Sequence, residues 1–489
     1  MNSSPTRRAP RARPLATYPQ RVLSGFGMAQ HAVCRYAAPA GSEELADLLA
    51  RASAEGMPVA LRGTGNSYGD AITNEHRLVI EMTRLNQLLH FDRDEGVVDV
   101  EPGFTYQNLW ELSIPNGFWP AVVPGTMKPT LAGCAAMNIH GKNNFKAGPI
   151  GDYILEFDLV TSAGHKLTCS RTENADIFHA AIGGLGMLGV FTRLRLQLRK
   201  VESGLLRVEG PLAHNLEEMF SIFEERLPRS DYLVGWIDGL ASGRALGRGV
   251  IHQANYITAA EDPEGPEQTL RVERQGLPNR LFGVPRGLLW RALRPFTNNA
   301  GMRLINTAKY WAGRQEARRG SYLQSHVQFA FLLDYIPNWK YAYGPGGFIQ
   351  YQPFVPKERA CEVFRELLTL CQRKGMPPYL VVLKRHRPDP FLLTHGLDGY
   401  SLAMDIRVHG WGRERVWALA SQLTERVLEA GGKFYFAKDA VIGPEDARRA
   451  FGRDRLEAFA TLKRRLDPHN LFQSDLSRRV FGELFGSRR

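Results

Sequence analysis

The chain has 489 residues, of which 44% are hydrophobic and 23% charged, and its formal net charge is +12. This composition excludes a disordered protein, and the length exceeds what one hydrophobic core supports, so we expect two or three domains. No apolar run is long enough to cross a bilayer as a helix. The five cysteines show no metal-ligand spacing, which predicts free thiols in a reducing compartment and no metal site.

The positive charge is concentrated in two segments. Residues 1–21 contain five arginines and no acidic residue, and residues 280–319 contain nine Lys or Arg against Glu316 alone. The remaining sequence is nearly neutral, so we expect no nucleic-acid partner. Residues 1–21 lack the apolar stretch of a secretory signal, and we predict a disordered basic tail there.

The first 200 residues are typical of a mixed α/β unit with glycine-rich connections. Apolar residues at helical spacing predict a helix that Ser42 caps at its start and Gly56 stops. The further elements predicted in this half are strands at 58–62, 77–82 and 97–102, a helix at 106–112, a hairpin at 157–169, a helix at 175–181 and a strand at 190–200.

The sequence changes character after residue 201, where charged helices alternate with apolar strands. The predicted elements are a helix at 215–227, a strand at 232–237, an exposed loop at 261–268, strands at 326–333, 348–355 and 379–384, and a long helix at 412–430. Between them, residues 280–319 mix arginines with Trp, Leu and Phe. That pattern indicates contact with an anionic membrane surface, and a solvated loop is the alternative.

Three glycine-rich loops stand out in the first half: RGTGNSYGD (62–70), a long segment that begins with VPGT (123–148) and GGLGMLG (183–189). Glycine lets backbone N–H groups approach a phosphate closely and form the concave turns that bind anions. The first loop matches neither the dinucleotide fingerprint nor the P-loop. Two such loops after strands can hold a diphosphate from both sides, although each loop by itself is more typical of a tight turn.

Taken in this order, the loops resemble the FAD-binding domain of the vanillyl-alcohol oxidase/p-cresol methylhydroxylase superfamily. Within it, the chain from about residue 22 to 480 is most similar to the decaprenylphosphoryl-β-D-ribose oxidase family, which acts in cell wall biosynthesis. The motifs that carry this resemblance are LSGFG (23–27), NSYGD (66–70), IHGKN (139–143), FIQYQ (348–352), YFAKD (435–439) and LDPHNLFQSDLSRR (466–479). IHGKN and YFAKD are the specific part, because the glycine loops alone indicate only the superfamily.

The resemblance implies an α+β fold with a two-lobed FAD-binding domain of the p-cresol methylhydroxylase (PCMH) type. It also implies a substrate domain built on an antiparallel sheet with flanking helices. We place the FAD-binding domain at 22–201, the substrate-binding domain at 202–432 with a basic insertion at 280–319, and a C-terminal segment that returns to the FAD domain at 433–489.

The resemblance further implies which residues contact FAD. They are Gly63, Asn66, Ser67, Tyr68 and Gly69 in the first loop, Gly125, Thr126, Gly133, His140 and Gly141 in the second, and Val190 and Tyr435 beyond them. Many relatives bond a histidine of the first loop covalently to the flavin. Asn66 occupies that position here, so we expect FAD to be bound non-covalently.

The family reaction moves a hydride from a secondary alcohol carbon to flavin N5, and the hydroxyl proton goes to a base or to water. Lys438 aligns with a family lysine that is expected to supply positive charge and orient the hydroxyl. Tyr68 is a candidate proton relay, with simple packing on the cofactor as its alternative. The residues expected to bind substrate are Lys142, Gln350, Gln352 and Lys384. A solvated position at a strand end is the alternative for the lysines and glutamines.

These expectations lead to FAD-dependent oxidation of C2 in a polyprenylphosphoryl-β-D-ribose-like substrate, giving a keto sugar. Ala403 replaces a cysteine of close members and segment 385–399 differs from the family pattern, so the sugar and the lipid stay open. The alternatives are an aldonolactone or small-polyol oxidase of the superfamily and an inactive membrane- or nucleic-acid-associated binding protein. The resemblance also implies an NAD-dependent short-chain reductase partner and a cytoplasmic location at the inner membrane face.

Overall fold

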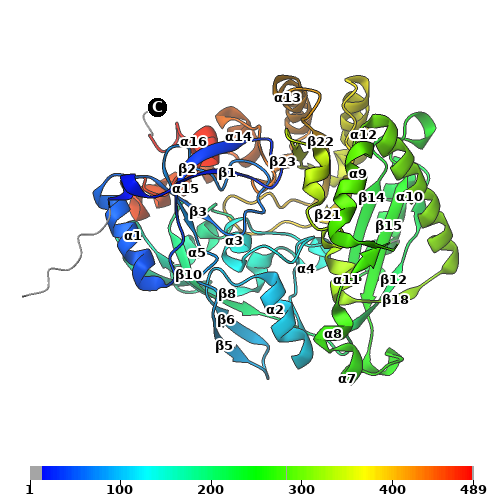
Figure 1. The fold of residues 1–489 in the computed structure, drawn as a ribbon, viewed down its shortest axis with the longest axis horizontal. Helices are drawn as coiled ribbons and strands as arrows, with labels where there is room; N and C mark the ends of the chain where they lie inside the picture. Colours follow the sequence, from blue (N-terminus) through cyan, green and yellow to red (C-terminus); the bar gives the residue numbers. More distant parts are fainter. Residues whose placement is uncertain (1–13, 282, 487–489) are drawn as a thin grey trace, which may run out of the picture.

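The computed structural model describes residues 14–281 and 283–486 and shows an α+β protein with β-sheets in two lobes (Figure 1). Most of the predicted tail, residues 1–13, lies outside the described residues, as does residue 282 of the basic segment. Residues 14–21 correct the prediction of a disordered tail. Leu15 is fully buried against the first helix, and a strand begins at Gln20.

The first lobe contains two sheets and a short ribbon. The first sheet has the order β1 (Gln20–Ser24), β2 (His31–Ala37), β4 (Leu78–Glu81) and β3 (Val59–Arg62). The second has the order β5 (Leu88–Asp92), β6 (Val97–Val100), β10 (Val190–Gln197), β8 (Ile154–Val160) and β9 (Lys166–Ser170). The ribbon pairs β7 (Phe118–Trp119) with β11 (Arg199–Lys200). Strands β2, β3 and β4 are parallel, and β4 and β6 are wholly or almost wholly buried.

Short helices connect these strands, and the apolar periodicity of the sequence locates several of them. The helices are α1 (Ser42–Ala54), α2 (Tyr106–Ser113), α3 (Leu131–Ala136), α4 (Asn144–Ala147) and α5 (Ala175–Ala181). The first follows the predicted pattern, with its leucines buried and Gly56 beyond its end in a left-handed conformation. Its N-cap is Gly41, one residue before the predicted start.

The second lobe is built on one large, mainly antiparallel sheet. Its order is β18 (Tyr322–Ser325), β12 (Leu205–Glu209), β15 (Gly249–Tyr256), β14 (Tyr232–Ile237), β21 (Val381–His386), β22 (Gly399–Arg407), β20 (Pro353–Pro356) and β23 (Lys433–Phe434). Strand β13 (Leu212–Ala213) pairs with β15, and β19 (Phe348–Tyr351) pairs with β22. Helices α6 (Leu216–Arg226), α12 (Lys357–Arg373) and α13 (Arg413–Glu429) pack together against this sheet (Figure 1).

The predicted strand at 326–333 and loop at 261–268 are both partly helical. Residues 326–333 form α11 (His326–Ala330) and a 3₁₀ turn, because the Ser325 side chain caps the helix by accepting from the N–H of Gln328 at 3.3 Å. Residues 261–268 belong partly to α7 (Pro266–Thr269), which is followed by α8 (Val272–Gln275). Pro266 at the first helical position favours that start.

The basic segment contains helices rather than a loop. It begins with the hairpin of β16 (Arg280–Leu281) and β17 (Val284–Pro285), continues through α9 (Leu289–Leu293) and ends with α10 (Asn299–Arg319). The last of these has 21 residues, and the Asn298 side chain caps it by accepting from the N–H of Gly301 at 3.0 Å. Among the described residues, no helix is both long and apolar enough to cross a membrane.

The C-terminal segment folds back onto the first lobe, where its red helices lie beside the blue N-terminal strands (Figure 1). It contains α14 (Pro444–Phe451), α15 (Arg453–Leu466) and α16 (Asp475–Phe481). Arg479 of α16 connects the C-terminal segment to the first glycine loop. Its guanidinium donates to Asp70 at 2.8 and 2.9 Å and to Asp439 at 2.9 Å. The ends of the NSYGD and YFAKD motifs are therefore held together by one side chain.

Candidate active site

A cavity of about 1020 Å³ lies where the two lobes meet. Ligand pockets usually measure about 300–1,000 Å³, so this one suits a large ligand. The cavity walls contain fifteen of the predicted site residues: Gly63, Asn66, Ser67, Tyr68, Gly125, Thr126, Gly133, His140, Lys142, Val190, Gln350, Gln352, Lys384, Tyr435 and Lys438. The structure thus gathers residues from the whole length of the chain around one space.

Gly69 and Gly141 are the two predicted contacts that lie outside the cavity wall. A Cβ on Gly69 would lie 2.1 Å from the carbonyl oxygen of Asp439. A Cβ on Gly141 would lie 2.4 Å from Oδ1 of Asn143. Both glycines therefore allow close packing of the protein at these positions, and their contact with a cofactor stays a prediction.

The first glycine loop is held in place from two sides by backbone hydrogen bonds. The N–H of Phe26 donates to the carbonyl oxygen of Ser67 at 2.7 Å, and the N–H of Tyr68 donates to that of Ala437 at 2.8 Å. LSGFG and YFAKD therefore hold NSYGD between them. Motifs more than 350 residues apart in the sequence, NSYGD and YFAKD, form one structural unit around the cavity.

The second loop meets the first at the opposite wall. Thr64 Oγ1 donates to the carbonyl oxygen of Lys128 at 2.9 Å, and a Cβ on Gly63 would lie 2.3 Å from Oγ1 of Thr130. Asp334 of the second lobe fixes this loop by accepting from Oγ1 of Thr126 at 2.7 Å. The close approach that glycine allows at position 63 is therefore used in the folded protein.

The two loops form a cradle of hydrogen-bond donors that fits a diphosphate. Within the described residues, no protein acceptor is found for the backbone N–H groups of residues 63–67. Arg62, Lys128 and Lys340 line the same end of the cavity, and the charges of Arg62 and Lys128 contribute, after burial, to lowering the pKa of Lys340. Free N–H groups beside several cations are the donor set that an anionic cofactor such as FAD requires.

Lys438 lines the cavity and contacts Tyr68. Its Nζ is 3.6 Å from the centroid of the Tyr68 ring. Burial lowers the pKa of Lys438 to about 7, with a further decrease from the charge of Lys384, while Asp405 opposes both effects. The same burial raises the pKa of Tyr68 well above 10, so its hydroxyl stays protonated at neutral pH.

Asp405 is a buried carboxylate that the sequence motifs did not single out. Strands β19 and β22 place Gln350 opposite Asp405, and Nε2 of Gln350 donates to Oδ1 of Asp405 at 2.6 Å. Burial raises the pKa of Asp405 to about 7. The available sequence signal was a single acidic residue in the otherwise uncharged stretch GYSLAMDI (399–406), since an acidic side chain is rarely buried in such a strand unless it is paired.

His140 belongs to a buried network of neutral polar groups. Its Nδ1 lies 3.0 Å from Nε2 of His395, and its Nε2 lies 3.1 Å from Nε2 of Gln352. His386 lies beside this pair and is hydrogen-bonded to Ser401 at 2.7 Å. Burial, followed by the positive charge of Lys384, keeps the pKa of His140 well below its usual value. His140 is therefore a fixed, uncharged part of the cavity wall.

The two predicted substrate lysines differ in their surroundings. Nζ of Lys142 donates to the carbonyl oxygens of Phe329 and, at 3.1 Å, Ala330, so its position is fixed. Lys384 lies on β21, and burial lowers its pKa to about 8. Two further residues of the cavity wall, His252 and Lys309, were missed by sequence reasoning because no motif contains them.

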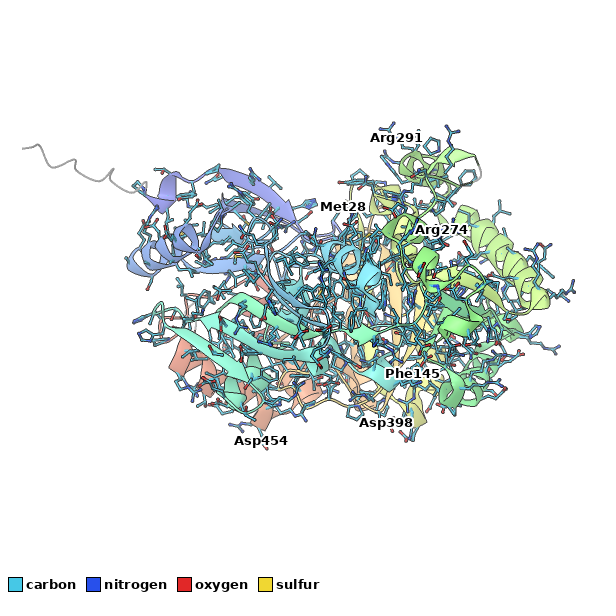
Figure 2. The ribbon with its side chains drawn as sticks, turned by 90° about the horizontal axis from the view of Figure 1, so that it is seen from below. Met28, Phe145, Arg274, Arg291, Asp398 and Asp454 are labelled. Atoms are coloured by element: carbon cyan, nitrogen blue, oxygen red, sulfur yellow. The ribbon has the colours of Figure 1, made fainter. Side chains whose placement is uncertain are left out.

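Part of the basic segment exposes apolar side chains at the surface. Leu288, Phe296, Leu304 and Trp311 are each about half exposed or more. Arg291 lies on the outward side of this region, which projects from the rest of the molecule (Figure 2). Exposed Leu, Phe and Trp among arginines give this surface an amphipathic, basic character.

Comparison with known proteins identifies the first lobe. Residues 34–170 match the FAD binding domain family. The chain is 28% identical to decaprenylphosphoryl-β-D-ribose oxidase of Mycolicibacterium smegmatis over 94% of this chain and 97% of that protein. It is 29% identical to an uncharacterised protein of Streptomyces coelicolor over 77% of this chain and 99% of that protein.

Cytokinin dehydrogenase 5 of Arabidopsis thaliana is 32% identical to this chain over 52% of the chain and 48% of that protein. The match to these relatives confirms the resemblance that the loops and motifs indicated. Together with the donor cradle and the cavity, it identifies the cofactor. The chain is an FAD-dependent oxidoreductase with an FAD-binding domain of the PCMH type, similar over nearly its whole length to decaprenylphosphoryl-β-D-ribose oxidase.

Proposed function

We propose that this enzyme oxidises the C2 hydroxyl of a polyprenylphosphoryl-β-D-ribose-like substrate to a ketone. The observation that carries the proposal is the half-buried Lys438, whose Nζ lies over the ring of Tyr68 at the cavity wall and whose pKa is influenced by the charges of Asp405 and Lys384. The similarity to decaprenylphosphoryl-β-D-ribose oxidase over 94% of the chain supports the substrate class. Bound FAD would supply the hydride acceptor for this oxidation.

Lys438 takes the hydroxyl proton in this account. With a pKa of about 7, a large fraction of its amino groups is neutral at physiological pH and able to accept a proton. The ammonium that results is stabilised by the carboxylate of Asp405. Tyr68 cannot act as the base, because its pKa is raised well above 10, and its ring instead positions Nζ.

The remaining cavity residues orient the substrate. Gln350 is fixed by its hydrogen bond to Asp405, and Gln352 is fixed by Ser401 at 3.2 Å and by His140. Side chains held in this way lose little entropy when substrate binds, which favours a near-attack geometry. Ala403 contributes a small side chain to the same wall and leaves space beside the reacting carbon.

Anaerobic bleaching of the flavin tests this proposal. Farnesylphosphoryl-β-D-ribose, a short-chain analogue, is expected to reduce the bound flavin fully, and ribose or ribonolactone is not. The rival function, an aldonolactone or small-polyol oxidase, predicts the reverse pattern. Purified protein that contains no flavin and takes up none would contradict both oxidase functions and favour a binding protein.

We also propose that FAD is bound without a covalent bond. The position used for attachment in many relatives is Asn66, whose amide is not a nucleophile and donates to Oγ1 of Thr64 at 2.7 Å. Acid precipitation is expected to release all flavin into the supernatant. Yellow precipitated protein would contradict this and indicate attachment through another residue.

The exposed apolar and basic face of segment 280–319 is proposed to contact an anionic membrane. Replacing Arg286, Arg291 and Arg294 by Glu is expected to abolish sedimentation with phosphatidylglycerol vesicles. Unchanged sedimentation of this variant would refute the contact.

The keto product would need a reductase to complete an epimerisation, which implies an NAD-dependent short-chain reductase as a partner.

A further inference from the structure

The cavity contains a second group of cations, separate from those at the glycine loops. Seven Lys or Arg side chains line the cavity, and Asp334 is the single Asp or Glu among its lining residues in the described part of the chain. Three of these cations belong to the diphosphate cradle, and Lys438 is central. The other three, Lys142, Lys309 and Lys384, lie on the side of the large sheet, and the proposed chemistry gives no role to Lys309.

The geometry places Lys309 and His252 together. Val234 pairs with His252 between β14 and β15, and the register of β14 with β21 places Val234 opposite Lys384. Since neighbouring strands are about 4.8 Å apart, His252 and Lys384 lie roughly 10 Å apart on one face. Helix α10 covers this face. The Nζ atom of its Lys309 lies at a distance of 4.3 Å from the ring centroid of Trp236.

The orientation of α10 supports a ligand-binding role for Lys309. Met302, Ile305, Asn306 and Lys309 all line the cavity, and their spacing puts them on one side of the helix. Lys309 has no ion pair in the described residues, and its side chain lines the cavity with part of its surface open to solvent. Partial burial of its amino group lowers its pKa to about 8, and the charge of Glu316 acts in the opposite direction. A lysine that lines the cavity without an ion-pair partner is available to an anionic ligand bound there.

His252 and Lys142 extend the same cationic region. The pKa of His252 is lowered to about 3, first by burial and then by the charges of Lys309 and Lys142, which places both lysines close to it. The neutral imidazole can still donate one N–H. The cavity is also lined by Leu281 and Leu293 of the basic segment, and α10 exposes the apolar side chain of Leu304 at the surface.

We propose that Lys309 and His252, together with Lys142, bind the phosphoryl group of the substrate, and that the chain attached to this phosphoryl group leaves along the apolar wall. This inference rests on the proposed function and specifies its substrate class: a sugar joined through phosphate to an apolar chain, and not a free sugar. Lys309 acts through charge and His252 through its N–H donor.

Binding of farnesyl phosphate to the FAD-loaded enzyme tests the site directly. This compound has no secondary hydroxyl, so its binding is independent of whether the enzyme oxidises ribosyl compounds. The dissociation constant is obtained from the change in flavin fluorescence for the wild type, Lys309→Gln, His252→Asn and the control Arg303→Gln. Arg303 lies on the same helix and is exposed, as Lys309 is, but it does not line the cavity. Its replacement therefore removes the same charge from the helix without changing the cavity wall.

We expect Lys309→Gln to weaken binding of farnesyl phosphate at least about tenfold, as for loss of a charged hydrogen bond, and His252→Asn to weaken it less. Arg303→Gln is expected to bind farnesyl phosphate as tightly as the wild type does. Farnesol, which lacks the phosphoryl group, is expected to bind to all variants with the same dissociation constant. Equal binding by Lys309→Gln and the wild type would overturn the proposal, as would an equal loss for farnesol and farnesyl phosphate.

Inorganic phosphate distinguishes the attached chain from the phosphoryl group alone. If it displaces farnesyl phosphate from the wild type but not from Lys309→Gln, the phosphoryl site is supported. If it binds as tightly as farnesyl phosphate, the apolar exit path is refuted. Should farnesylphosphoryl-ribose bind with the predicted dependence on Lys309 yet fail to reduce flavin, the proposed oxidation fails while the phosphoryl site stands.

Discussion

The two ends of the cavity recognise anions by different means. At the glycine loops the donors are backbone N–H groups of residues 63–67, supported by Arg62 and Lys128. At the large sheet the donors are the side chains of Lys142 and Lys309. Backbone donors depend on the path of the loop, whereas side-chain donors depend on single residues. Substitutions at the glycine loops should therefore weaken cofactor binding, and substitutions at the large sheet should weaken substrate binding alone.

Lys438, which lies between the two ends, gives the largest expected effect. Lys438→Met is expected to slow flavin reduction by about 10²–10⁴-fold, the range for loss of a general base, while the flavin content stays that of the wild type. Stopped-flow absorbance under anaerobic conditions measures both quantities. A variant that loses flavin but keeps its reduction rate would show that Lys438 belongs to the cofactor end.

Arg479 is expected to hold the ends of the NSYGD and YFAKD motifs together. Arg479→Gln leaves the carboxylates of Asp70 and Asp439 without their cation, and breaking such a buried ion pair costs about 3–5 kcal/mol of unfolding free energy. Denaturant unfolding of the holoprotein measures this change. The matched control is Arg448→Gln, which removes exposed surface pairs and should change stability little. Equal stability of the two variants would contradict the role of Arg479.

Gly63→Ala tests the cofactor end alone. The added Cβ would lie 2.3 Å from Oγ1 of Thr130, so the first loop must shift, at a cost of about 1–3 kcal/mol. We expect weaker FAD affinity with unchanged binding of farnesyl phosphate. Gly287→Ala serves as the control, because a Cβ there meets nothing within 4 Å. Retention of FAD by Gly63→Ala through dialysis that matches the wild type would argue against the cradle.

The pH dependence of Asp405→Asn is the smallest and most specific test. The negative charge of Asp405 raises the pKa of Lys438, so its removal lowers that pKa. Lys438 acts as a base only when it is neutral, and therefore the rate of the wild type should rise with pH through about 7. The Asp405→Asn profile should rise at lower pH. A shift to higher pH would indicate that Lys438 acts as a cation.

The sequence predicts the cofactor end well and the substrate end poorly, for a physical reason. A backbone cradle needs closely spaced glycines, so RGTGNSYGD and its partner loops are visible as motifs in the sequence. Asp405, His252 and Lys309 come from two strands and a helix that only the sheet register and the covering of α10 bring together. No local sequence pattern indicates that these three residues lie near the same cavity.

The errors in secondary structure have a related cause. Segment 326–333 consists mainly of apolar residues and is too short for its period to distinguish a strand from a helix, and the capping bond from Ser325 decides for the helix. Residues 14–21 have the composition of a disordered tail, yet burial of the single side chain of Leu15 orders them. A local capping bond decides the first case, and tertiary packing overrides local composition in the second.

The central claim is that the carbon–hydrogen bond at C2 of the substrate is broken during oxidation by this enzyme. Anaerobic stopped-flow reduction with farnesylphosphoryl-β-D-ribose deuterated at C2 measures this most directly. The account predicts that the deuterated compound bleaches the flavin several-fold more slowly than the undeuterated one. Equal rates for the two, with slowing only when C1 or C3 carries the deuterium, would contradict it.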